Sequence, residues 1–78
     1  MASRDYPNEL NNFVQGLHKS HLLRDIAKMN ADSKMWTVTY IFKDTVVVGE
    51  GRDLSKKVAK RIAAMEALDK FQAGEVDL

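Results

Sequence analysis

A run of β-favouring residues places the strongest constraint on the fold of this 78-residue chain. Every residue from Trp36 to Phe42 is β-branched or aromatic. Trp36, Val38, Tyr40 and Phe42 alternate with Thr37, Thr39 and Ile41, which is the period of two expected of a strand. Lys43-Asp44-Thr45 then provides a short turn, Val46-Val47-Val48 a returning strand, and Gly49-Glu50-Gly51 its end. The middle of the chain is therefore predicted to be an antiparallel β-hairpin.

Helical patterns flank this hairpin on both sides. Before it, apolar residues recur at the i, i+3, i+4 and i+7 spacing of an amphipathic helix, namely Leu10, Phe13, Val14 and Leu17. Because proline suits a first helical turn, we predict a helix from about Pro7 to Lys19. After the hairpin, Asp53 or Ser55 can cap a second helix that runs to about Phe71, with Ala73-Gly74 as its stop signal.

The segment between the first helix and the hairpin is ambiguous. Periodicity does not decide whether residues 22–29 continue a helix or form a short strand, and Asn30-Ala31-Asp32-Ser33 reads as a turn. The order helix, weak strand, two strong strands, helix predicts an α+β fold, α-β-β-β-α. In this fold both helices pack on one face of a three-stranded antiparallel sheet, and the other sheet face is partly wet.

The aromatic residues of the predicted strand have two possible uses. Trp36, Tyr40 and Phe42 share one strand face and would fill the core beneath the helices. A platform on which nucleic-acid bases stack is the alternative. The core interpretation is favoured because a chain this small buries only about 60–65% of its unfolded surface and needs these rings inside.

Composition indicates one folded domain. We predict a domain over residues 7–72, between a flexible start at 1–6 and a flexible tail at 73–78. No apolar run approaches the ~20 residues of a transmembrane helix, and Met1-Ala2-Ser3-Arg4 does not begin a signal peptide. We expect a soluble, intracellular protein, with nucleus and cytoplasm equally open.

The sequence offers little for metal, cofactor or catalytic chemistry. The absence of cysteine excludes disulfides, thiolate zinc sites and cysteine nucleophiles. His18 and His21 have no third ligand at a recognisable spacing, so we expect no metal and no cofactor. Ser20, His21 and Asp25 lack a nucleophile elbow, and Gly49-Glu50-Gly51 lacks the third glycine of a dinucleotide loop. We therefore predict that the chain is not an enzyme.

A basic cluster opens the second helix, and it consists of Lys56, Lys57, Lys60 and Arg61. Cations in a first turn are repelled by the helix dipole, at a cost of a few tenths of a kcal/mol each, unless an anion offsets them. Unpaired N–H groups, the dipole and the ammonium groups together form a clamp for phosphate. The alternative is a solvated face opposite a core stripe of Val58, Ile62 and Met65.

The chain here resembles the double-stranded RNA-binding domain, whose second helix opens with Lys-Lys-x-Ala-Lys-x-x-Ala-Ala. Residues 56–64, Lys-Lys-Val-Ala-Lys-Arg-Ile-Ala-Ala, match every fixed position of that motif, and Gly49-Glu50-Gly51 matches the preceding Gly-x-Gly. The resemblance covers roughly Pro7 to Phe71. It implies shape-dependent binding of duplex RNA across two minor grooves and the phosphates between them.

The resemblance also implies roles for particular residues. Lys56, Lys57 and Lys60 would contact phosphates, and Arg61 joins them on electrostatic grounds. Three small residues, Ala59, Ala63 and Ala64, would let the second helix lie close to the sheet. Minor-groove contacts would come from the first helix and from the loop between the first two strands, through Asn11, Asn12, Asn30, Ser33 and Lys34. That loop lacks the Gly-Pro-x-His sequence usual in the family.

Two functions follow from these observations. The first is duplex-RNA binding by a module of a larger RNA-processing or regulatory protein. The second is a protein-interaction or dimerisation module of the same fold with weak or no RNA binding, which the net charge of only +1 and the altered loop favour. An exposed strand edge near Val46 to Val48 would allow a partner strand, or a second copy, to add to the sheet.

Overall fold

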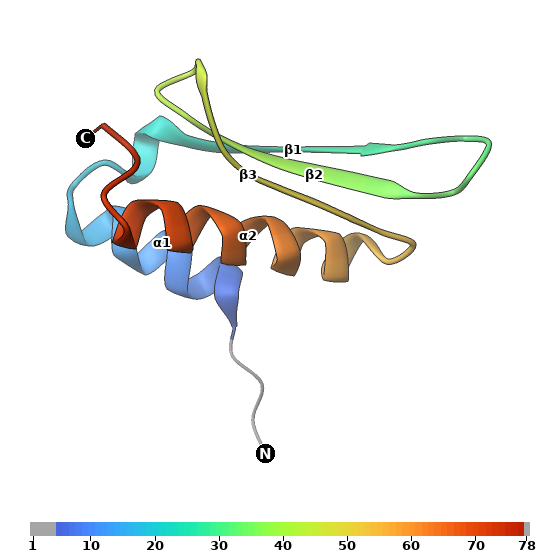
Figure 1. Cartoon of the computed structure of the whole chain (residues 1–78), viewed down its shortest axis with the longest axis horizontal. Coiled ribbons are helices and arrows are strands. Elements are labelled where there is room, and N and C mark those ends of the chain that lie inside the picture. The colour runs from blue at the N-terminus through green and yellow to red at the C-terminus, as the bar shows by residue number, and fades with distance from the viewer. Residues whose placement is uncertain (1–4, 78) are drawn as a thin grey trace.

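Three antiparallel strands form a sheet, and two helices cover one of its faces (Figure 1). The structure is a computed structural model and describes residues 5–77. Its elements are α1 (Tyr6–Gly16), the 3-10 helix η1 (Ser20–Leu22), β1 (Leu23–Met29), β2 (Trp36–Phe42), β3 (Val46–Asp53) and α2 (Lys56–Gln72). The predicted α-β-β-β-α fold is confirmed.

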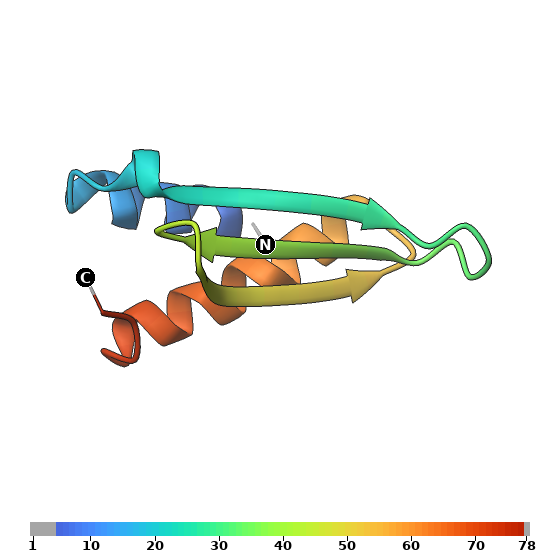
Figure 2. The ribbon, with the colours of Figure 1, turned by 90° about the horizontal axis from the view of Figure 1, so that it is seen from above.

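The sheet has the strand order β1-β2-β3, and Figure 2 shows its uncovered face from above. The ambiguous segment is strand β1, which pairs with β2 from Leu23 opposite Phe42 to Met29 opposite Trp36. The hairpin between β2 and β3 forms at residues 43–45 as predicted. The predicted end of the returning strand at residues 49–51 is wrong, because β3 continues to Asp53.

Helix α1 ends earlier than predicted, at Gly16 rather than Lys19. The His18 N–H donates to the Gln15 carbonyl and the Lys19 N–H donates to the Val14 carbonyl, which is the Schellman pattern. His18 takes the left-handed conformation of this motif, with φ of 59°, a position that glycine usually occupies. The left-handed position that closes the helix therefore carries histidine, and the glycine of this segment, Gly16, is the last helical residue.

Helix α2 runs one residue beyond the predicted Phe71, and Ser55 is its cap, with the Val58 N–H donating to the Ser55 hydroxyl. Asp53 instead accepts a hydrogen bond from the Ser55 N–H at 2.7 Å.

The predicted stop signal of α2 is confirmed, because Gly74 adopts a φ of 73° just after the C-cap. The segment beyond it returns to the protein, where Val76 is buried in the core. Most of the predicted flexible start, residues 1–6, lies outside the described residues.

The core stripe of α2 differs from the predicted Val58, Ile62 and Met65. Met65 is exposed and the other two are half-buried. The buried side chains are Ala59, Ala63, Ala64, Ala67, Leu68 and Phe71. Small residues face the sheet because Gly49 and Gly51 of β3 have no side chains to hold the helix away. The predicted close-packing role of the alanines is confirmed.

The aromatic residues of β2 divide between the core and the surface. Phe42 is fully buried and meets the Phe71 ring edge-on, with ring centroids 5.2 Å apart, and Tyr40 is also buried. Neither ring is available as a platform for bases. Trp36, the first residue of β2, is only half-buried and lies at the start of α2.

The Tyr40 hydroxyl is buried and makes no hydrogen bond within the described part of the chain. Burial, followed by the negative charges of Asp25 and Asp5, raises the pKa of Tyr40 from 10.0 to about 12. The folded state therefore holds this proton more tightly than the unfolded state does. The resulting stabilisation is complete below pH 10 and is lost as the pH rises toward 12.

Replacing Tyr40 with phenylalanine should remove this alkaline destabilisation. Between pH 10 and 12 the wild-type chain is expected to lose roughly 2–3 kcal/mol more stability than Tyr40→Phe. At pH 7 the variant should be at least as stable, because a buried hydroxyl without a partner is removed. Urea unfolding of both proteins at a series of pH values measures the difference. Parallel pH dependences would contradict the expected role of this hydroxyl.

Candidate nucleic-acid interface

The first turn of α2 presents positive charge and unpaired N–H groups together. The Ser55 hydroxyl and carbonyl accept hydrogen bonds from Val58 and Ala59, so the helix supplies no acceptor for the N–H groups of Lys56 and Lys57. The first turn contains no acidic residue. Both lysine side chains are exposed. An anion at this helix start would meet the dipole, two N–H groups and two ammonium groups.

Trp36 holds the side chain of Lys56. The Lys56 ammonium nitrogen lies 5.3 Å from the centroid of the Trp36 ring, which is a cation–π distance. Trp36 also begins β2, directly after the β1–β2 loop, so this contact joins the loop base to the helix start. The aromatic ring restricts a flexible side chain and places its charge between the two elements.

Lys60 lies one turn further along α2, on the same side as Lys56. Its ammonium nitrogen is 3.9 Å from a carboxylate oxygen of Asp25 on β1, and both side chains are nearly half exposed. An exposed pair at this distance contributes little to stability. Asp25 therefore leaves the charge of Lys60 available to solvent, while partly neutralising it.

Lys57 and Arg61 form the neighbouring column on α2, with the same i, i+4 spacing. Both are exposed, and neither side chain has an ion pair or hydrogen bond among the described residues. The structure thus places all four predicted phosphate-binding residues on the first two turns of one helix.

A stripe of neutral amide side chains runs along the exposed face of α1. Its members, spaced at i, i+3, i+4 and i+7, are Asn8, Asn11, Asn12 and Gln15. The opposite face buries Leu10 and Val14. Asn11 and Asn12 were predicted from the sequence. Asn8 and Gln15 were not, although the helical spacing of amide residues would have found them.

The β1–β2 loop uses two of its three predicted contact residues to hold its own shape. The Asn30 side-chain oxygen accepts hydrogen bonds from the N–H groups of Asp32 and Ser33, at 2.9 and 3.2 Å. The Ser33 hydroxyl accepts one from the Met35 N–H at 3.3 Å. Lys34 has a left-handed backbone, with φ of 62°, and an exposed side chain.

A family model for the double-stranded RNA binding motif matches residues 7–71. The chain belongs to this family. No curated protein and no solved structure matches the chain. The double-stranded RNA binding motif is a binding domain rather than a catalytic one, and its partner is double-stranded RNA.

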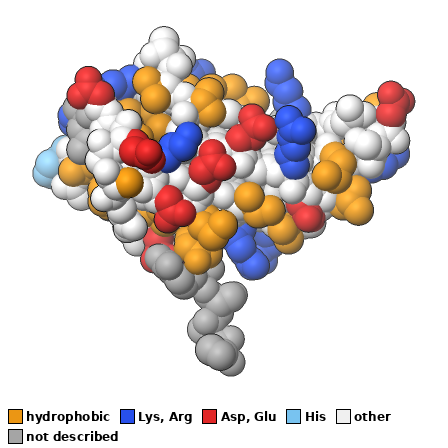
Figure 3. All heavy atoms as spheres, in the orientation of Figure 1, with side chains coloured by type: hydrophobic (Ala, Val, Ile, Leu, Met, Phe, Trp, Pro, Cys, Tyr) orange, Lys and Arg blue, Asp and Glu red, His pale blue; other side chains and the backbone are white. Residues whose placement is uncertain are grey.

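Charge is distributed unevenly over this double-stranded RNA-binding domain. Figure 3, in the orientation of Figure 1, shows Lys and Arg side chains below the first half of α2 and others above the sheet, with acidic side chains between them. Among the described residues, no group of three or more His, Asp or Glu side chains could hold a metal ion. None of the described helices is long and apolar enough to cross a membrane.

Two contacts of the domain's basic helix start could not be found from sequence spacing. Trp36 and Asp25 come from strands β2 and β1, and each reaches α2 only through the packing of the sheet on the helix. A stretch with lysines at its start indicates the charges. It does not indicate that Lys56 contacts an aromatic ring or that Lys60 lies near a carboxylate.

Proposed function

We propose that this chain binds double-stranded RNA by its shape. In this proposal Lys56, Lys57 and Lys60, supported by Arg61, contact phosphates across the major groove, and the amide stripe of α1 lies in an adjacent minor groove. The chain acts as a binding module of a larger RNA-processing or regulatory protein and performs no catalysis itself.

The observation that carries this proposal is the pair of lysines at the start of α2, neither of which has an ion pair among the described residues. Two lysines face the positive end of the helix dipole, and no acidic residue stands in that turn. Trp36 keeps the Lys56 charge in place instead of letting it move away from the dipole. A phosphate would convert this unfavourable arrangement into a favourable one.

The amide stripe supports the choice of a minor groove. Neutral amides both donate and accept hydrogen bonds, as a ribose 2′-hydroxyl does. They also avoid the repulsion that a carboxylate would meet beside phosphates. Asn8, Asn11, Asn12 and Gln15 can therefore read RNA sugars without reading base sequence, and a DNA duplex lacks the hydroxyl partners.

The β1–β2 loop is proposed to reach a second minor groove through Lys34. Asn30 and Ser33 serve this contact by fixing the loop, because their side-chain oxygens accept hydrogen bonds from the loop backbone. Asp32 is exposed in the same loop, and its negative charge would repel a phosphate. We therefore assign this loop a smaller share of the affinity than the start of α2.

Fluorescence anisotropy tests the proposal directly. A labelled RNA duplex of about 20–24 bp, longer than the ~16 bp such domains span, is titrated across about 50–200 mM salt. Single-stranded RNA and the matching DNA duplex serve as competitors. Salt-sensitive binding with a clear preference for the RNA duplex is expected. Equal competition by all three nucleic acids, or no binding by the folded protein, would contradict the proposal and favour the protein-interaction alternative.

A further inference from the structure

The carboxylate of Asp25 lies beside the basic first half of α2. Asp25 pairs with Tyr40 across the β1–β2 register, so both side chains leave the sheet on the face that the helices cover. One Asp25 carboxylate oxygen is 3.9 Å from the Lys60 ammonium nitrogen. The pKa of Tyr40, raised first by burial and then by the charge of Asp25, agrees with this direction of the carboxylate. Asp25 thus brings negative charge to the surface that we assign to RNA phosphates.

Stability gives little reason for a carboxylate at this position. Asp25 makes no side-chain hydrogen bond among the described residues. The side chains of Asp25 and Lys60 keep 49% and 42% of their surface exposed, and an exposed ion pair contributes little to the free energy of unfolding. Removing the charge of Asp25 should therefore leave the fold intact.

We infer that Asp25 competes with an RNA phosphate for the Lys60 ammonium group and thereby limits the affinity for duplex RNA, an inference that rests on the proposed function. While Lys60 keeps its position, a phosphate oxygen bound to its ammonium group at about 2.8 Å lies no further than about 7 Å from the Asp25 carboxylate oxygen. This separation is shorter than the Debye length of about 10 Å at 0.1 M salt, so the two negative charges repel one another. A phosphate must therefore displace Asp25 from Lys60 or bind beside it with a lower affinity.

Trp36 and Asp25 act on neighbouring lysines in opposite ways. The Trp36 ring contacts the Lys56 ammonium group at 5.3 Å without neutralising its charge, so the lysine still attracts a phosphate. Asp25 instead brings a full negative charge to Lys60, one helical turn further along α2. Lys56 is restrained and fully charged, whereas Lys60 is already partly paired. Loss of the Asp25 charge should make Lys60 a stronger phosphate contact.

Asp25→Asn tests this inference, because it removes the charge and keeps the size of the side chain. By fluorescence anisotropy, the variant should bind an RNA duplex of about 20–24 bp about two- to fivefold more tightly than the wild type at ~50 mM salt. The gain should shrink as the salt concentration rises toward about 200 mM, because salt screens the repulsion. Asp25→Lys, which reverses the charge, should give a larger gain.

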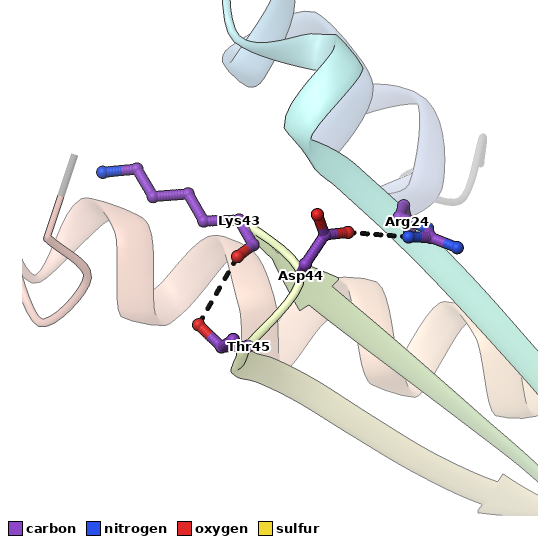
Figure 4. A network of polar contacts seen from close by, with 4 residues as sticks. All are labelled: Arg24, Lys43, Asp44 and Thr45. Carbon is purple, nitrogen blue, oxygen red and sulfur yellow. Dashed lines mark hydrogen bonds and ion pairs between the residues drawn. The ribbon is translucent and has the colours of Figure 1, made fainter.

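Asp44→Asn is the matched control. Asp44 also belongs to an exposed ion pair, at 2.6 Å from Arg24, but it lies in the β2–β3 turn, at the opposite end of β3 from the start of α2 (Figure 4). Asp44→Asn changes the net charge by the same amount and releases a positive side chain in the same way. It should change the RNA affinity far less.

A double-mutant cycle with Lys60→Ala shows whether Asp25 acts through Lys60. When Lys60 is already alanine, Asp25→Asn should give no more gain than Asp44→Asn, because Asp25 then has no ammonium group to compete for. Circular dichroism and urea unfolding check that each variant is folded.

The outcomes separate this inference from the proposed function. A wild-type chain that binds the duplex, with Asp25→Asn no tighter than Asp44→Asn, would overturn the inference and leave the proposed function standing. An undiminished gain from Asp25→Asn in the Lys60→Ala background would overturn it as well, because Asp25 would then act only as a general negative charge. If neither the wild type nor Asp25→Asn binds the duplex, the proposed function fails and this inference fails with it.

Discussion

Replacing Lys56 and Lys57 together with alanine is expected to weaken duplex-RNA binding about 10- to 100-fold at moderate salt. Neither side chain forms an ion pair within the described residues, whereas Lys60 faces the carboxylate of Asp25. The loss should be similar for all duplex sequences. The slope of log affinity against log salt should fall by about one for each phosphate contact removed. Anisotropy at several salt concentrations measures both quantities.

Stability provides an internal check on this result. Removing two cations from a first turn relieves their repulsion by the helix dipole, by a few tenths of a kcal/mol each, while Lys56→Ala also gives up the Trp36 contact. The double variant should therefore unfold close to the wild-type urea midpoint.

A second double variant, Lys28→Ala with Arg52→Ala, is the control for net charge. It removes the same number of positive charges from the uncovered sheet face and should change the RNA affinity far less. Equal losses in both double variants would show that net charge alone drives binding.

The sequence predicts the parts of this fold that depend on neighbouring residues. The β2–β3 hairpin follows from an unbroken run of β-favouring residues and a short turn, and the end of α2 follows from Gly74. The end of α1 could not be predicted in the same way, because His18 takes a left-handed conformation that its residue type does not favour. Two backbone hydrogen bonds, donated by the His18 and Lys19 N–H groups, close that turn without a glycine.

The core stripe of α2 shows a second limit. Hydrophobicity ranks Val58, Ile62 and Met65 above alanine, yet the alanines are buried because the glycines of β3 bring the strand close to the helix. The same limit applies to the binding site. Its lysines are visible in the sequence, whereas the ring of Trp36 and the carboxylate of Asp25 reach them only in the folded chain.

The close approach of β3 and α2 makes Gly49 and Gly51 the most sensitive glycines of the domain, and Gly51 is the more crowded of the two. A Cβ at Gly51 would overlap the Ala59 carbonyl oxygen and lie 2.6 Å from the Ala63 backbone nitrogen. Backbone atoms in a helix cannot move aside as the end of a flexible side chain can. Gly51→Ala is therefore expected to cost about 3 kcal/mol or more, a large part of the 4–12 kcal/mol typical of a chain this size.

The same substitution at two other glycines separates this clash from the general effects of replacing glycine. A Cβ at Gly16 meets no atom within 4 Å and sits in helix α1, so Gly16→Ala should stabilise the protein by roughly 0.5 kcal/mol. Gly74 has equally open space but a φ of 73°, so Gly74→Ala should cost about 1 kcal/mol through backbone strain alone. Urea unfolding of the three variants should rank them Gly16→Ala, Gly74→Ala, Gly51→Ala in falling stability. If Gly51→Ala were no worse than Gly74→Ala, contact between the two backbones would not be what requires glycine in β3.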